Sequence, residues 1–185
     1  MIHSHQAKKR WEVLNLQIEL ASSMGFCSGV KRAIKLAEEA VQERNSVNSL
    51  GAIVHNQQVV SLLVNQGMRI KESLKEVTSD TILIPSHGVG PQIMNQIDES
   101  GLSVVDTTCS IVHKAQMVAQ SLGDAGFHVL VFGDASHVEV KGLLLWAGTN
   151  AEAVLDIPKF DKVPKKIGIL SQTTQSKTRF ASFLS

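Results

Sequence analysis

The sequence has few cysteines, almost no net charge and no long hydrophobic run. Two cysteines among 185 residues are too few for the disulfide framework of a small secreted domain. A formal net charge of +1 creates no broad electrostatic field, so nothing favours nucleic acid or an acidic membrane as a partner. No apolar run approaches the roughly 18 residues that a membrane-spanning helix needs.

The N-terminal segment, residues 1 to 17, is basic but lacks the apolar centre of a secretory signal peptide. We expect it to be an extension outside the fold, and we expect the protein to be cytoplasmic with reduced thiols. Hydrophobic residues make up 43% of the chain and charged residues 19%. This balance is ordinary for a globular protein that can fill a core.

Short apolar segments alternate with helical patterns along the rest of the chain. The patterns predict strands at residues 18–22, 50–54, 81–85, 102–106, 127–133 and 166–172, and a turn at 45–49. They predict helices at residues 30–44, 57–66, 91–100, 110–123 and 138–148, and another helix after 176. Apolar strands separated by helices favour parallel α/β layers.

The two halves of the sequence are related by a repeat. A shift of 82 residues aligns Cys27 with Cys109 and His55 with His137. The same shift aligns Ser28 with Ser110, Val30 with Val112, Arg32 with Lys114, Ala33 with Ala115, Ala37 with Ala119 and Gly51 with Gly133. We therefore expect two tandem, pseudo-repeated α/β domains, residues 18–101 and 102–185, that arose by internal duplication.

Polar and thiol side chains follow the predicted strands in both halves. These residues are Cys27, His55, His87, Cys109, His137 and Thr173. In parallel α/β units, ligands gather beyond the carboxyl ends of the strands. Two such units that face each other would bring these side chains to one cavity.

Each cysteine stands where a predicted helix begins, and there the helix dipole and the free backbone N–H groups favour thiolate. Thiolate is the form that binds soft metals and iron–sulfur clusters. Neither cysteine has a partner at CxxC spacing, so the remaining ligands would come from distant segments. The alternative is that each thiol is buried and packs as a small hydrophobic side chain.

His55, His87 and His137 have small or polar neighbours in the sequence. Imidazole binds metal when it is neutral and phosphate when it is protonated. Glu139 could transfer protons beside His137, and the hydroxyl of Thr173 could orient a ligand. The alternatives are solvated loop histidines and side chains that only cap or complement a helix terminus.

Six segments combine these residues into one pattern. They are GFCSGVKRAI (25–34), IVHNQQVV (53–60), SHGVGP (86–91), DTTCSIVHKAQ (106–116), GDASHVEVKG (133–142) and LSQTT (170–174). In order and spacing they resemble the 4-hydroxy-3-methylbut-2-enyl diphosphate reductases, the last enzymes of the non-mevalonate isoprenoid pathway. The resemblance begins near residue 18 and continues to the last residue.

The resemblance implies an oxidoreductase that removes the substrate hydroxyl as water and yields isopentenyl and dimethylallyl diphosphate. It implies that Cys27 and Cys109 ligate a four-iron four-sulfur (4Fe-4S) cluster, and that ferredoxin or flavodoxin supplies the electrons. The implied roles of the other residues are diphosphate binding by His55 and His87, a position facing the substrate for His137, proton donation by Glu139, and orientation of the hydroxyl and the proton relay by Thr173.

The family consists of three similar α/β domains, each of which supplies one cysteine to the cluster. Adding the repeat interval to Cys109 places the next cysteine near position 191, which this sequence does not include. We therefore expect the chain to hold the first two of three domains, without the third cysteine ligand, and to be inactive alone. Two local departures, SMG before Cys27 and Val138 after His137, leave the expected ligands unchanged.

Two other functions stay open. The first is a non-catalytic remnant that binds a diphosphate through its histidines and has lost the cluster. The second is a two-cysteine redox protein, which would contain a disulfide between Cys27 and Cys109.

Overall fold

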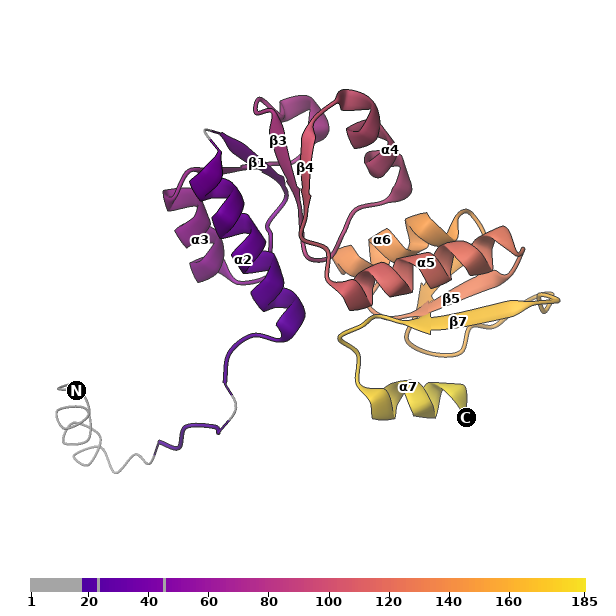
Figure 1. Ribbon diagram of the computed structural model, residues 1–185. Coiled ribbons are helices and arrows are strands. Elements are labelled where there is room, and N and C mark those ends of the chain that lie inside the picture. Colours follow the sequence, from indigo (N-terminus) through magenta and orange to yellow (C-terminus); the bar gives the residue numbers. More distant parts are fainter. Residues whose placement is uncertain (1–17, 23, 45) are drawn as a thin grey trace.

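The computed structural model describes residues 18–22, 24–44 and 46–185. The expected N-terminal extension, residues 1–17, therefore lies outside the described residues. The strands form two separate parallel sheets (Figure 1). Their strand orders are β2-β1-β3-β4 and β6-β5-β7. The expected fold of two parallel-sheet α/β units is confirmed. We call them the first lobe and the second lobe.

Each lobe is defined by its helices and strands. The first lobe contains α2 (Ser28–Glu43), β1 (Val47–Leu50), α3 (Gln57–Asn65), β2 (Met68–Lys71), the 3-10 helix η1 (Leu74–Glu76), β3 (Thr81–Ile84), α4 (Pro91–Ser100) and β4 (Ser103–Asp106). The second lobe contains α5 (Ser110–Asp124), β5 (His128–Phe132), α6 (Val138–Ala147), β6 (Ala151–Val154), β7 (Ile167–Ser171) and α7 (Lys177–Leu184).

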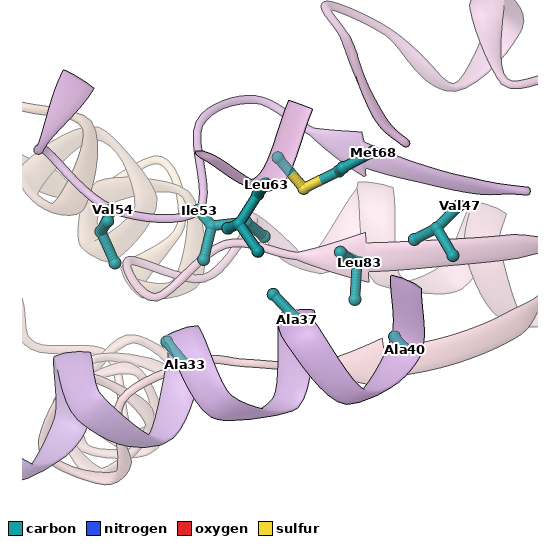
Figure 2. Close-up of a cluster of buried hydrophobic side chains, with 9 residues drawn as sticks. All are labelled: Ala33, Ala37, Ala40, Val47, Ile53, Val54, Leu63, Met68 and Leu83. Atoms are coloured by element: carbon teal, nitrogen blue, oxygen red, sulfur yellow. The ribbon is translucent and has the colours of Figure 1, made fainter. Parts of the chain in front are cut away.

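The first sheet has a hydrophobic core on each face. On one face, Ala33, Ala37 and Ala40 of α2 are buried against Val47 and Leu83 of the sheet (Figure 2). Residues at this spacing share one side of a helix, and small alanine side chains let the helix approach the strands closely. This approach brings the first turn of α2 toward the carboxyl ends of the strands.

The opposite face of the first sheet packs against α4. Ile82 and Ile84 of β3 contact Ile97 of α4 there, while Leu83 of the same strand points into the α2 core. All four residues of β3 are buried, as expected for a strand that is covered by helices on both sides. Its continuous apolar pattern explains why this strand is predicted correctly.

The second sheet is covered unequally. Helices α5 and α6 lie side by side on one face, where Val129 and Val131 join the second core (Figure 1). Helix α7 lies on the other face and contacts the sheet through aromatic side chains, with ring centroids of Phe132 and Phe183 4.8 Å apart. Ile169 of β7 stays 39% exposed.

Strand β1 begins earlier than the sequence predicts. We expect a strand at 50–54 after a turn at 45–49, whereas the strand comprises Val47–Leu50. Asn48 and Ser49 are polar but fully buried. Asn48 Oδ1 accepts a hydrogen bond from the Thr78 N–H and the Ser49 hydroxyl donates to the Gly51 carbonyl, whereas Asn48 Nδ2 has no partner among the described residues. Buried polar residues with partners look like a turn in a sequence pattern.

One other local prediction is wrong, and two strands are not predicted. The segment 18–22, predicted as a strand, has no regular structure. Leu20 is 79% exposed there, so the apolar residues of this segment are not packed against either sheet. Strands β2 and β6 are absent from the prediction. Both are short edge strands with few large apolar residues, MRIK and AEAV, and such strands give a weak pattern.

The change from one sheet to the other occurs later than the sequence repeat suggests. The repeat predicts a boundary near residue 101, but β4 pairs with β3 throughout its length and belongs to the first sheet. The chain passes into the second lobe just before Cys109. The strand that precedes the second cysteine therefore completes the sheet of the preceding lobe.

The lobes also touch through side chains of α6. The indole Nε1–H of Trp146 donates a 2.8 Å hydrogen bond to the carbonyl of Val89 in the first lobe. Gly90 lies close to Leu145, because a Cβ at Gly90 would be 2.7 Å from Leu145 Cδ1.

Among the described residues, no helix has the length and apolarity needed to cross a membrane.

Candidate active site

One cavity of about 230 Å³ is lined by residues of both lobes. All seven candidate residues from the sequence lie on its wall: Cys27, His55, His87, Cys109, His137, Glu139 and Thr173. Five of them follow the carboxyl end of a strand, which is where parallel α/β proteins place their ligands. We call this space the inter-lobe cavity.

The two cysteines occupy equivalent positions in equivalent helices. Cys27 is the N-cap residue of α2 and Cys109 is the N-cap residue of α5, and neither side chain caps its helix. Both are free thiols, so the disulfide expected for a two-cysteine redox protein is not formed. Cys27 is exposed and Cys109 is partly buried, so neither is a fully buried packing thiol.

Three imidazoles form a cluster beside the thiols. The ring centroid of His55 is 5.8 Å from that of His87 and 5.4 Å from that of His137. Burial, together with the charges of His55 and His137, lowers the pKa of His87 to about 4, against the opposing effect of its backbone hydrogen bond to Gly88. His87 is therefore neutral near pH 7 in this cavity.

The hydrogen bonds of the histidines determine which nitrogen carries the proton. Nδ1 of His87 lies 3.0 Å from the Gly88 carbonyl oxygen, which can only accept, so Nδ1–H donates and Nε2 has a free lone pair. Nδ1 of His137 accepts from the Glu139 N–H at 3.1 Å, so its ring proton is on Nε2. His137 is thus a donor at Nε2, and neutral His87 is an acceptor at Nε2.

Glu139 connects helix α6 to the segment after β7 at the wall of the cavity. Its side chain is buried in the first turn of α6 and holds Thr173 by two hydrogen bonds. The Thr173 N–H donates to Oε1 at 2.6 Å, and the Thr173 hydroxyl donates to Oε2 at 2.9 Å. The hydroxyl oxygen of Thr173 keeps lone pairs that can accept another hydrogen bond.

Several residues of the cavity wall are absent from the sequence prediction. They are Phe26, Val30, Val54, Asn56, Ser86, Val112 and Thr174. Val30 and Val112 are aligned by the 82-residue repeat, and that equivalence could have identified them as an apolar wall shared by both halves. Asn56 caps α3 by accepting from the Val59 N–H, a role typical of asparagine anywhere in a protein.

The two thiol sulfurs at the cavity are of the atom type that usually ligates iron–sulfur clusters. Two free thiols face the same space, and thiolates are the usual protein ligands of such clusters. Within residues 18–22, 24–44 and 46–185, no group of three or more histidine, cysteine or acidic side chains is arranged to hold a metal ion. The described residues thus bring two thiols to the cavity.

The whole described region is similar to known proteins. The 4-hydroxy-3-methylbut-2-enyl diphosphate reductase of Dehalococcoides mccartyi (strain CBDB1) is 45% identical over 172 residues, which cover 91% of this chain and 61% of the relative. The reductase of the same name from Geobacter metallireducens is 42% identical over 163 residues, 87% of this chain and 58% of the relative. The chain thus spans about three fifths of these curated relatives.

Two solved structures agree with the fold. The reductase structure from Plasmodium falciparum has a TM-score of 0.80 and 28% identity, with 88% of this chain and 53% of that chain covered. A structure described as the terminal enzyme of the non-mevalonate pathway has a TM-score of 0.71 and 33% identity, with 90% and 61% covered. A family model described as LytB protein matches residues 18–185, and the chain therefore belongs to the LytB protein family.

Proposed function

We propose that this chain forms the substrate-binding and part of the cluster-binding region of a 4-hydroxy-3-methylbut-2-enyl diphosphate reductase. The observation that carries the proposal is the inter-lobe cavity, where two thiols, three imidazoles and a carboxylate–threonine pair meet. The names of relatives at 40–45% identity support it. The proposed reaction removes the substrate hydroxyl as water, consumes two electrons and two protons, and yields isopentenyl and dimethylallyl diphosphate.

In this proposal the imidazole cluster binds the diphosphate. His137 offers an Nε2–H donor without a change of protonation. His87 can donate from Nε2 only after it gains a proton, because its Nδ1–H already donates to Gly88. An anionic diphosphate would raise the pKa of His87 from about 4 and favour this protonation.

Glu139 and Thr173 would deliver a proton to the leaving oxygen. A proton on the Glu139 carboxyl can pass to the Thr173 oxygen, and the Thr173 hydroxyl can then donate its own hydrogen to the substrate oxygen. The Thr173 N–H holds the carboxylate in place during this exchange. The apolar Val30 and Val112 side chains limit water on the adjoining wall.

Cys27 and Cys109 would hold the cluster together with ligands that this sequence does not contain. When bound, a four-iron four-sulfur cluster supplies the electrons and a Lewis-acidic iron. From the family resemblance we also propose that a cytoplasmic ferredoxin or flavodoxin supplies those electrons. The alternative is the remnant function, in which a diphosphate binds without a cluster. The presence of only two cysteines favours it, and the iron-loading test below distinguishes it from the reductase function.

The test measures binding and iron loading on the same chain. Calorimetric titration with 4-hydroxy-3-methylbut-2-enyl diphosphate is expected to show binding that His55→Ala and His137→Ala weaken strongly. His113→Ala is the matched control, because His113 is an exposed α5 residue outside the cavity wall. No binding by the wild-type chain would contradict the proposal.

Anaerobic addition of iron and sulfide then distinguishes the two functions. A brown chain with visible charge-transfer absorbance, lost in Cys27→Ala and Cys109→Ala, supports the reductase. Binding of the diphosphate without any cluster supports the remnant function. With reduced viologen as electron source, we expect no useful turnover by this chain alone, since it supplies only two thiolates; robust turnover would refute that expectation.

A further inference from the structure

The first turn of α2 touches the residue that begins α5. A Cβ at Gly29 would lie 2.5 Å from Cys109 Sγ and 3.2 Å from Cys109 Cβ. Real Cβ atoms do not approach other atoms so closely, so the thiol occupies space that only glycine leaves open. The Cys109 thiol therefore rests against the backbone of α2, two residues after Cys27.

A second contact comes from the next turn of the same helix. The guanidinium of Arg32 donates from Nη1 to the Thr108 carbonyl at 3.2 Å and from Nη2 to the Asp106 carbonyl at 3.4 Å. These carbonyls belong to the segment directly before Cys109. The end of this segment is also attached to the loop after β3 of the first lobe, because the Cys109 N–H donates to the Ser86 carbonyl at 2.9 Å.

These contacts differ from an ordinary helix–sheet attachment. At the far end of α2, Arg44 donates from Nη1 to the Thr81 hydroxyl at 3.0 Å and to the Ser103 hydroxyl at 2.6 Å. Arg44 thus attaches the helix to the start of β4, and Arg32 attaches it beyond the end of the same strand. Only the Arg32 contact reaches the segment that carries a thiol.

We propose that Gly29 and Arg32 are positioning residues that fix the Cys109 thiol relative to the Cys27 thiol. Gly29 sets how closely the Cys109 side chain approaches α2, and Arg32 sets where the backbone before it lies. The α2 helix begins at one cysteine and holds the other, so it determines the separation of the two sulfurs. The consequence for cluster ligation rests on the function proposed above, but the thiol separation itself can be measured without iron.

The test is thiol cross-linking in the full 185-residue chain, reduced and free of metal. Dibromobimane joins two nearby thiols, and mass spectrometry identifies the Cys27–Cys109 product. Arg32→Met and Gly29→Ala are expected to slow the cross-link by about tenfold, since a displacement of about 1 Å can cost up to about 10²-fold in rate. Arg44→Met is the matched control for Arg32→Met, because Arg44 attaches the same helix away from the thiols. Gly142→Ala is the matched control for Gly29→Ala, because a Cβ at Gly142 meets no atom within 4 Å.

Arg32→Lys keeps a donor on a long side chain and is expected to recover part of the rate. Circular dichroism melting identifies any variant that fails to fold; if Gly29→Ala does so, the Arg32→Met, Arg32→Lys and Arg44→Met set decides the question. A wild-type cross-linking rate in folded Arg32→Met would overturn the proposal, as would an equal loss in Arg44→Met.

Iron loading separates this proposal from the proposed function. Slower cross-linking in the Arg32 and Gly29 variants supports thiol positioning whether or not iron binds. If the wild-type chain binds no iron and sulfide, the cluster function fails while the cross-linking result still stands. If it binds them, the two variants are expected to hold less iron per chain than Arg44→Met.

Discussion

Cys27 is exposed and follows residues without regular structure, whereas Cys109 is partly buried and follows strand β4. The segment before Cys109 is bound to the first lobe by the Thr107 hydroxyl, which donates to the Ile84 carbonyl at 2.5 Å, and by the Cys109 N–H. Arg32 adds a contact from α2. Cys27 is positioned chiefly by the helix that it begins.

The difference shows that a sequence repeat need not produce equivalent mechanical support. Cys109 begins a helix of the second lobe but is anchored on the first lobe, so its position depends on both. Cys27 depends on α2, whose alanine face is packed into the first core. The two thiols should therefore respond differently to changes that loosen one lobe.

The largest expected effect is on the second core. Leu143 of α6 is fully buried there, and Leu143→Ala should lower the free energy of unfolding by about 2–5 kcal/mol. Alkylation of Cys109 by iodoacetamide should become faster, because local opening of the second lobe frees the start of α5. Alkylation of exposed Cys27 should hardly change.

Leu63→Ala is the matched change in the first core, where Leu63 of α3 is also fully buried. It should lower the free energy of unfolding to a similar extent. It should also make alkylation of Cys109 faster, since the hydrogen bonds that hold Cys109 in place come from the first lobe. Equal acceleration of Cys27 and Cys109 in both variants would contradict the comparison. Urea unfolding gives the stabilities, and peptide mass spectrometry gives the two alkylation rates.

The next effect concerns His87, whose pKa is lowered mainly by burial to about 4. The unfolded chain binds more protons than the folded chain between pH 4 and 6.5, so stability should fall as the pH drops through this window. At 1.36 kcal/mol per pKa unit the loss approaches roughly 3 kcal/mol. Urea unfolding at several pH values should show that the free energy of unfolding decreases toward low pH in the wild type and decreases less in His87→Asn.

Trp146→Phe should have a smaller effect. It removes the hydrogen bond from the indole to the Val89 carbonyl between the lobes, which is expected to cost about 0.5–1.5 kcal/mol. Because this contact joins the lobes near the His87 loop, Cys109 alkylation should again rise more than Cys27 alkylation. An unchanged unfolding free energy and unchanged alkylation rates would show that the contact does not couple the lobes.

The smallest effect is expected at His128 in the second lobe, at the edge between β5 and β6. Its Nδ1 lies 2.7 Å from Asn150 Oδ1 and its Nε2 lies 2.8 Å from Glu152 Oε1, and these partners raise its pKa. Its stabilisation is present below pH 6.5 and is lost as the pH rises through the folded-state pKa.

Surface pairs of this kind contribute no more than about 1 kcal/mol. The sign is opposite to that of His87, so the two lobes should differ in their response to pH. His128→Asn should remove the loss of stability on the alkaline side and leave the acidic slope unchanged. Unfolding curves of this variant with the same pH dependence as the wild type would contradict the assignment.

The sequence predicts the architecture where burial produces a simple pattern. The continuous apolar run of β3 and the Pro91 that begins α4 both lie where the sequence places them. β1 is displaced because polar Asn48 and Ser49 are buried in the strand, and the hydrogen-bond partner of Asn48, Thr78, lies 30 residues further along the chain. No local pattern contains that information.

The candidate site shows the same limit. Strand ends and the repeat indicate the thiols and histidines, and the structure brings these residues to one cavity. Their roles in substrate and cluster binding stay predictions. The contact of Gly29 with Cys109 and the anchoring of the Thr108 carbonyl by Arg32 depend on packing between segments about 75–80 residues apart, and spacing in the sequence cannot show them.

The most direct test of the central claim is protection of both thiols by a bound diphosphate. If the thiols and the imidazole cluster share one cavity, saturating 4-hydroxy-3-methylbut-2-enyl diphosphate should slow alkylation of Cys27 and Cys109 together. The protection should disappear in His137→Ala and persist in His113→Ala. Unchanged alkylation of both thiols in a chain that calorimetry shows to be saturated would contradict the claim that they lie beside the diphosphate site.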